Sequence, residues 1–121
     1  MCIRDRLDII AGRGHGVGLI WFENPNWNIY DINTDLMSPH CLQVGDIDAD
    51  GDIDAVTCAY VSRKAAWFEN DGKGRFTTHI INNDQAAYDI RLVDIDADGD
   101  LDTLIAGQQS KNIVWYENPL K

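Results

Sequence analysis

Two short acidic stretches constrain this chain more than any other feature. Each places an aspartate at every second position of nine residues, with one glycine among them, as DIDADGDID and DIDADGDLD. At an effective dielectric of about 20, two carboxylates about 4 Å apart repel each other by roughly 4 kcal/mol. A bound cation would offset that repulsion, whereas a solvated turn needs only one or two Asp or Gly residues. The stretches therefore predict two cation-binding loops. Their ten candidate ligands are Asp46, Asp48, Asp50, Asp52, Asp54, Asp94, Asp96, Asp98, Asp100 and Asp102.

The ligand types in these loops indicate calcium. Ca²⁺ takes about 6–8 oxygen ligands in a flexible shell, whereas Zn²⁺ prefers His and Cys, which neither loop contains. Counted from Asp46, the sixth position is Gly51, whose backbone can adopt a positive φ and turn sharply around an ion. An EF-hand loop begins in the same way but needs a bidentate Glu at its twelfth position. That position is Thr57 in the first stretch and Ile105 in the second, so the EF-hand is excluded.

The loops belong to a longer internal repeat. The step from Asp46 to Asp94 sets a repeat period of roughly 48 residues, and periods of about 20–50 are typical of solenoids, propellers and arrays. An aromatic tetrapeptide recurs in the same phase. It is WFEN at Trp21 and at Trp67, and WYEN at Trp115.

A third copy of the loop is indicated near the start of the chain. The ninth loop position, Asp54, precedes Trp67 by the same interval by which Asp8 precedes Trp21. Asp8 is therefore expected to be the ninth position of a third loop whose beginning is missing. The opening MCIRDR is the translation of ATGTGTATAAGAGACAG with one further base, which matches an adapter used in sequencing libraries. We expect residues 1–6 to be an adapter artefact and the chain to be a fragment.

Short strands separated by turn residues fill each repeat. Runs rich in β-branched and aromatic residues alternate with Gly, Asn and Asp, and no helical periodicity is present. Each period thus holds about four short strands, as a propeller blade does. The expected strands are 7–12, 18–24, 27–33, 41–47, 53–60, 65–70, 75–81, 89–95, 101–107 and 112–119, with a connection at 34–40 and a hairpin turn at 70–74.

The pattern D-x-D-x-D-G-x-x-D running straight into a strand resembles the calcium loops of FG-GAP or VCBS repeats in integrin-α-like β-propellers. The resemblance covers residues 7–121 and implies an all-β partial propeller of about two and a half four-stranded antiparallel blades. It implies a partial blade at about 7–45, a full blade at about 46–93 and a partial blade at about 94–121. It also implies two structural Ca²⁺ sites, with side-chain ligands at positions one, three, five and nine and a carbonyl ligand at position seven.

Composition limits the partners. The net charge of −10 argues against nucleic-acid backbones, and no apolar run reaches the length of a membrane span. The resemblance implies an extracellular, periplasmic or cell-surface location, a protein or glycan ligand, and packing against the remaining blades of a parent chain. The pairing of Cys41 and Cys58 stays open between a disulfide and buried free thiols.

No catalytic residue is predicted. Three equivalent glutamates, Glu23, Glu69 and Glu117, do not define one active site, and His79 is expected to be an ordinary strand residue. The recurring tryptophans are expected to pack between blades, with a sugar-stacking platform as the alternative. An alternative function is the propeller portion of a secreted carbohydrate-active lyase or dehydratase whose active site lies outside or across this fragment.

Overall fold

The computed structural model describes residues 2–3 and 6–119, and this part of the chain is all β, without a helix and so without a helical membrane span. All strand pairs are antiparallel. A short pair comes first, β1 (Cys2–Ile3) and β2 (Arg6–Leu7). The first sheet holds β3 (Ile9–Gly12), β4 (Val17–Glu23) and β5 (Asn28–Met37). The central sheet holds β6 (Pro39–Gly45), β7 (Asp54–Ala59), β8 (Lys64–Asn70) and β9 (Phe76–Asn82). The third sheet holds β10 (Asp89–Val93), β11 (Asp102–Gly107) and β12 (Asn112–Tyr116).

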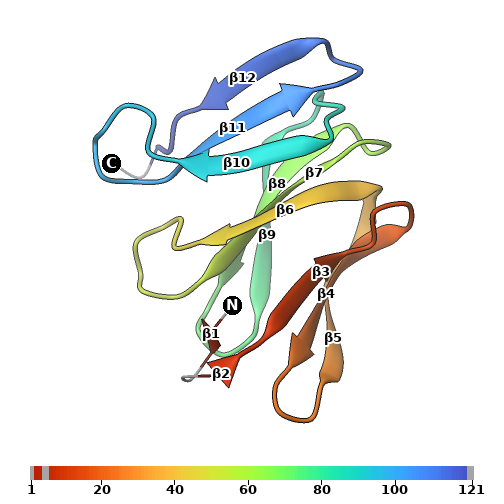
Figure 1. Cartoon of the computed structure of the whole chain (residues 1–121), viewed down its shortest axis with the longest axis vertical. Helices are drawn as coiled ribbons and strands as arrows, with labels where there is room; N and C mark the ends of the chain where they lie inside the picture. Colours follow the sequence, from red (N-terminus) through yellow and green to blue (C-terminus); the bar gives the residue numbers. More distant parts are fainter. Residues whose placement is uncertain (1, 4–5, 120–121) are drawn as a thin grey trace.

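The three larger sheets are stacked in chain order, with the central sheet between the other two (Figure 1). Within each sheet the strands follow one another in sequence order. Side chains alternate between the faces of a strand, so neighbouring residues of β7 enter different cores. Ala55 packs with Trp21 of the first sheet, and Val56 packs with Ile90 of the third. Strand β7 is therefore buried on both faces.

The recurring tryptophans occupy three different environments. Trp21 is 5% exposed in the core between the first and central sheets, where its ring contacts Tyr30 and Phe76. Trp67 is half-buried and stacks on His79. Trp115 is 43% exposed on the third sheet. Packing between neighbouring sheets thus describes Trp21 well, whereas Trp115 lies on a face that no described sheet covers.

Strand β5 is longer than expected. The predicted connection at 34–40 is instead the end of β5 and the start of β6, because the side chain of Asn33 organises a bulge. The Asn33 Oδ1 atom accepts the backbone N–H groups of Asp35 at 3.0 Å and Leu36 at 2.9 Å. The chain then turns at Ser38, which has a φ of 57°.

Sheet boundaries and sequence repeats are out of phase. The first sheet ends at Met37 and the central sheet starts at Pro39, whereas the sequence period is counted from Asp46. Strand β6, which precedes the first acidic loop, therefore belongs to the same sheet as the three strands after it. The expected adapter origin of residues 1–6 falls in part on residues 1, 4 and 5, which lie outside the described residues.

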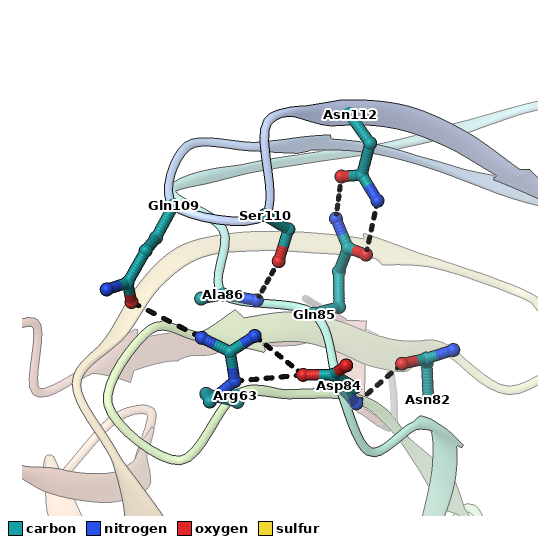
Figure 2. A network of polar contacts seen from close by, with 8 residues as sticks. All are labelled: Arg63, Asn82, Asp84, Gln85, Ala86, Gln109, Ser110 and Asn112. Carbon is teal, nitrogen blue, oxygen red and sulfur yellow. Dashed lines mark hydrogen bonds and ion pairs between the residues drawn. The ribbon is translucent and has the colours of Figure 1, made fainter.

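A polar network joins the central and third sheets (Figure 2). It includes the β7–β8 turn, so it lies at the opposite end of the central sheet from the β6–β7 connection. Arg63, in the β7–β8 turn, contacts Asp84 at 2.6 Å and donates to the Gln109 side chain at 3.3 Å. Gln85 and Asn112 exchange two amide hydrogen bonds, at 2.7 and 3.3 Å. These bonds fix the chain segment that leads from β9 into the third sheet.

The two cysteines of the central sheet are free thiols that face each other across neighbouring strands. Cys41 on β6 pairs in register with Cys58 on β7. Cys58 is fully buried, and this burial raises the pKa of its thiol to about 12. The Cys41 Sγ atom donates to the Asp89 carboxylate at 3.2 Å.

Candidate metal centres

The two acidic stretches form equivalent loops between the first two strands of their sheets. One connects β6 to β7 and the other connects β10 to β11, so both loops lie at the same end of their sheets (Figure 1). In each loop the alanine at the fourth position has a φ of 63°, and the glycine at the sixth has a φ of 95° or 97°. Two left-handed residues two positions apart curl the backbone tightly. The residues are Ala49 and Gly51 in the first loop and Ala97 and Gly99 in the second.

The carboxylate at the first position closes the first loop. The two oxygens of Asp46 accept the backbone N–H groups of Asp50 at 3.1 Å and Gly51 at 3.0 Å. Asp48 also accepts from the Asp50 N–H, at 3.2 Å, and Asp50 accepts from the Asp52 N–H at 2.8 Å. Each of the first three aspartates is therefore held by the backbone of the loop that it faces.

The second loop repeats this scheme almost unchanged. Asp94 accepts the N–H groups of Asp98 at 3.1 Å and Gly99 at 2.9 Å. Asp96 accepts from Asp98 at 3.2 Å, and Asp98 accepts from Asp100 at 3.1 Å. Two stretches one repeat period apart thus build the same loop from the same hydrogen bonds.

The ninth-position aspartates tie each loop to the sheet. Asp54 is fully buried, and its two oxygens accept the N–H groups of Ile47 at 2.9 Å and Asn70 at 2.8 Å. Asp102 accepts from Ile95 and Asn118 in the same way. The N–H of Asn24 donates to Asp8 at 2.8 Å, as that of Asn70 does to Asp54. This third copy of the bond agrees with the assignment of Asp8 to a ninth loop position.

Carboxylate oxygens converge in both loops. Ligand atoms of Asp46, Asp48 and Asp50 lie within 4.8 Å of one another. Two such groups occur at the second loop, and one includes the glutamate of the aromatic tetrapeptide WYEN. They are Asp94, Asp96 and Asp102, and Asp96, Asp98 and Glu117.

Glu117 beside the second loop was not anticipated. It stands at the end of β12, far from the loop in sequence, and reaches it because Asn118 donates its backbone N–H to Asp102. The Asn118 side chain also donates to the Ile47 carbonyl of the first loop at 2.8 Å. The aromatic tetrapeptide recurs at a fixed distance from the ninth loop position. That spacing is the sequence signal that could have indicated this proximity.

The electrostatics of the loops favour a bound cation or proton. Burial, and then the charge of Asp54, raise the pKa of Asp48 to about 6. Burial, and then the neighbouring Asp98, raise the pKa of Asp100 to about 6. The pKa values of Asp54 and Asp96 are also raised, mainly by burial. A carboxylate whose charge is disfavoured in this way is stabilised by a positive ion.

The donor set fits Ca²⁺. It consists of oxygens alone, arranged on a curled loop, as this hard cation requires. Both side-chain oxygens of Asp100 are buried without a hydrogen-bond donor, and such groups normally have a partner. Its counterpart Asp52 lies instead against Gly72, where an added Cβ would be 2.6 Å from a carboxylate oxygen.

A cavity of about 530 Å³ adjoins the first loop. Its lining includes Asp48, Trp67 and Tyr116, together with a hydrogen-bonded contact between the Glu69 carboxylate and the His79 imidazole at 3.1 Å. The expectation that His79 is a satisfied strand residue agrees with this pair. The first sheet has Tyr30 at the position cross-strand from its tryptophan, so this Glu–His pair has no counterpart there.

A cluster of rings at the other end of the sheets was also not anticipated. His40 contacts His15 and Tyr88, with ring centroids 4.9 and 4.2 Å away, and Tyr60 stacks on Tyr88 at 4.5 Å. His15, in the β3–β4 turn, is exposed and packs against His40. His40 and Tyr88 stand one repeat period apart, and their equal phase is the signal that could have revealed the cluster.

The comparison with protein families agrees with this geometry. A family model described as an FG-GAP-like repeat matches residues 46–105. The match starts at the first acidic loop, includes the second and ends in β11. No curated protein and no solved structure matches the chain. Through residues 46–105, which hold both acidic loops, the chain belongs to the FG-GAP-like repeat family.

Proposed function

We propose that each acidic loop binds one Ca²⁺ ion, which acts as a structural cross-link in a β-propeller-type repeat module. FG-GAP-like repeats support a module of this type. Within a loop, the side chains at positions one, three, five and nine and the carbonyl at position seven are the ligands. In the first loop these are Asp46, Asp48, Asp50, Asp54 and Asp52; in the second they are Asp94, Asp96, Asp98, Asp102 and Asp100. When bound, the ion supplies positive charge that offsets the repulsion among the carboxylates.

The observation that carries this proposal is the duplication of the loop geometry. Both loops hold their first and third aspartates by matching backbone hydrogen bonds, all between 2.8 and 3.1 Å. Both also place a non-glycine residue, Ala49 or Ala97, in the left-handed region. Left-handed alanines and crowded carboxylates each cost free energy, and ion binding is the function that would offset that cost in both loops.

A calorimetric Ca²⁺ titration tests the proposal. The whole chain should show two sites, and the double variant Asp50→Ala/Asp98→Ala should show none. The single variants Asp50→Ala and Asp98→Ala should each retain one site, which assigns one ion to each loop. Mg²⁺ serves as the control cation, because it demands a tighter octahedral shell. If a chain with β-type circular dichroism releases or absorbs no heat with Ca²⁺, the loops are acidic turns and the proposal is wrong.

The architecture and location follow from the same proposal. The three sheets β3–β5, β6–β9 and β10–β12 are assigned to three neighbouring blades. The boundaries between these sheets lie a few residues ahead of the sequence-period bounds at 7–45, 46–93 and 94–121. The module belongs to a secreted, periplasmic or cell-surface protein, where FG-GAP-like repeats typically occur. Extracellular calcium modules typically have dissociation constants of about 10⁻⁴–10⁻³ M. Labelling of intact cells with an antibody against residues 46–105 tests this location, and labelling only after permeabilisation would contradict it.

A protein or glycan ligand is proposed for the end of the sheets that carries the ring cluster. Tyr88 is 43% exposed there, and Tyr60 and His40 support it from neighbouring segments. Exposed aromatic rings offer apolar faces on which sugar rings or side chains stack. A glycan array probed with the chain and with Tyr88→Ala tests this, with Val61→Ala in the β7–β8 turn as a control. If both variants bind glycans equally well, the ring cluster is not the ligand-binding site.

A second candidate function is part of a carbohydrate-active lyase or dehydratase. The observation in its favour is the Glu69–His79 pair in the 530 Å³ cavity beside Trp67. An imidazole held by a carboxylate can accept a proton. Elimination from an acidic polysaccharide forms a double bond that absorbs ultraviolet light, so activity is measurable directly. Activity lost in His79→Gln and kept in His15→Gln would support an enzyme, whereas no activity in the unmodified chain rejects this pair as an active site.

A further inference from the structure

The first and third sheets lie on either side of the central sheet (Figure 1). Each leaves apolar side chains exposed on the face that points away from the central sheet. On the first sheet, Ile9 is 52% and Ile29 is 61% exposed. On the third sheet, Ile113 is 78% and Trp115 is 43% exposed. We call these the first outer face and the third outer face. Contiguous exposed apolar side chains of this kind mark interaction surfaces.

The interface between the first and central sheets shows what such faces bind. There, Leu19 and Trp21 of the first sheet pack against Ala55, Ala66 and Phe68 of the central sheet, and all five are buried. One side supplies a tryptophan and an aliphatic residue from alternate positions of one strand. The other side supplies a phenylalanine flanked by two smaller residues.

The third outer face repeats the tryptophan side of that interface. Trp115 and Ile113 stand one repeat period after Trp67 and Ala65 of the central sheet. Leu104 pairs in register with Trp115, as Val56 does with Trp67. Trp67 and Val56 face the third sheet. Trp115 and Leu104 therefore face outward, on the side where a further sheet would pack.

The first outer face repeats the phenylalanine side. The spacing between Trp21 and Trp67 is one repeat period. The same spacing separates Ile9 from Ala55, Ile20 from Ala66 and Phe22 from Phe68. Ile9 pairs in register with Phe22, as Ala55 does with Phe68. The first and third outer faces thus resemble the two sides of the interface between the first and central sheets, so the two faces are complementary to each other.

We propose that a second copy of this chain docks its first outer face on the third outer face of the first copy. The contact continues the sheet stacking from one molecule to the next. It is heterologous, since different surfaces meet, and it leaves one face open at each end of the assembly. Ile9 and Trp115, which represent the two outer faces, lie outside both acidic loops, so failure of this proposal and failure of the calcium proposal are separate results.

The charge of the chain makes the driving force testable. Each copy carries a net charge of −10, so two copies repel each other at low ionic strength. Association through apolar faces should therefore strengthen as salt screens the repulsion. Association through ion pairs would weaken under the same conditions.

Two charge variants test the docking, one on each face. Ile9→Glu disables the first outer face, and Trp115→Glu disables the third. Both side chains are exposed on the surface and belong to neither described core, so the fold should survive, which circular dichroism checks. Sedimentation velocity of the unmodified chain at tens of micromolar should show concentration-dependent dimers and larger species. Each variant alone should be monomeric, with a dissociation constant raised by about 30-fold or more.

A mixture of the two variants gives the decisive result. Each retains one intact face, so an equimolar mixture should form a one-to-one dimer and nothing larger. Val61→Glu, on a side chain that is 54% exposed in the β7–β8 turn, is the matched control and should associate like the unmodified chain. The proposal is overturned if the unmodified chain stays monomeric. It is equally overturned if either variant alone still associates, which indicates pairing of sheet edges, or if the mixture stays monomeric.

Discussion

Asp54 connects the first acidic loop, strand β7 and the aromatic tetrapeptide WFEN. The contribution of its negative charge to stability can be tested directly. Its two oxygens accept separate backbone N–H groups, from Ile47 and Asn70. Asp54→Asn leaves one acceptor oxygen and turns an amide N–H₂ toward the other donor. We expect the free energy of unfolding in urea, measured with chelator present, to fall by about 1–3 kcal/mol.

Asp71→Asn is the matched control. Asp71 also accepts two backbone N–H groups, from Lys73 and Arg75, but at a single oxygen that an asparagine retains. Its stability should change little. Equal losses in both variants would show that the loss reflects a general cost of neutralising aspartates and not the buried geometry of Asp54.

The raised pKa values of Asp48 and Asp100, each about 6, predict opposite pH responses with and without calcium. A carboxyl whose pKa is higher in the folded state than its usual 3.8 binds its proton more tightly when folded. Without Ca²⁺, these two groups should therefore add stability as pH falls from about 7 toward 5. Ca²⁺ competes with the proton on the proposed ligand Asp48, and its charge disfavours the proton on the nearby Asp100. The affinity for Ca²⁺ should therefore fall over this range. Calorimetric titrations at several pH values check both signs, and a calcium affinity independent of pH would contradict the assignment.

Burial should separate the reactivity of the two cysteines. Cys58 is fully buried with a pKa of about 12, whereas Cys41 is only half-buried. The thiolate is the reactive form, so iodoacetamide at mildly alkaline pH should modify Cys41 and leave Cys58 intact in the folded chain. Peptide mass spectrometry reads each site separately. Modification of Cys58 without denaturant would show that β6 and β7 open readily.

At the scale of the elements, the β8–β9 turn is fixed by a glycine that touches the neighbouring sheet. Gly74 has a φ of 85°, and an added Cβ would lie 2.6 Å from two ring carbons of Trp21. Gly74→Ala therefore strains the backbone and displaces a buried ring. We expect it to lower the free energy of unfolding by about 2 kcal/mol or more. Gly14→Ala, in the β3–β4 turn with no atom within 4 Å of the added Cβ, should lose less than about 1 kcal/mol.

Most elements could be predicted because local sequence determines them. The acidic loops follow from the spacing of Asp and Gly, and strands such as β7 and β8 follow from β-branched and aromatic runs between turns. The extension of β5 could not be predicted, because it depends on one side chain, Asn33, capping its own bulge.

The parts of the site that the sequence did not reveal depend on contacts between elements. Glu117 reaches the second loop only through the bond of Asn118 to Asp102. The ring cluster joins His15, His40 and Tyr88 from three separate segments. A linear pattern records the phase of such residues but not the stacking of the sheets that brings them together.

For the whole molecule, calcium should contribute a large share of stability. A site with a dissociation constant of about 10⁻⁴–10⁻³ M adds about 1.4–2.7 kcal/mol at about 10 mM Ca²⁺, so two sites add about 3–5 kcal/mol. Urea unfolding in calcium and in chelator measures the difference. The double variant Asp50→Ala/Asp98→Ala should show none of it. Sodium chloride at equal ionic strength controls for general screening of the −10 charge.

The offset between sequence period and sheet boundary has a consequence for how such chains grow. A period counted from Asp46 begins after β6. The first strand of that period, β7, is therefore hydrogen-bonded to a strand, β6, that belongs to the period before it. Tandem duplication of one period in a gene would insert three strands and the opening strand of the next sheet together. Every new unit would thereby be joined to the unit before it by backbone hydrogen bonds between two strands of one sheet. Such a chain can lengthen by whole periods without ever creating a unit that folds detached from its neighbours.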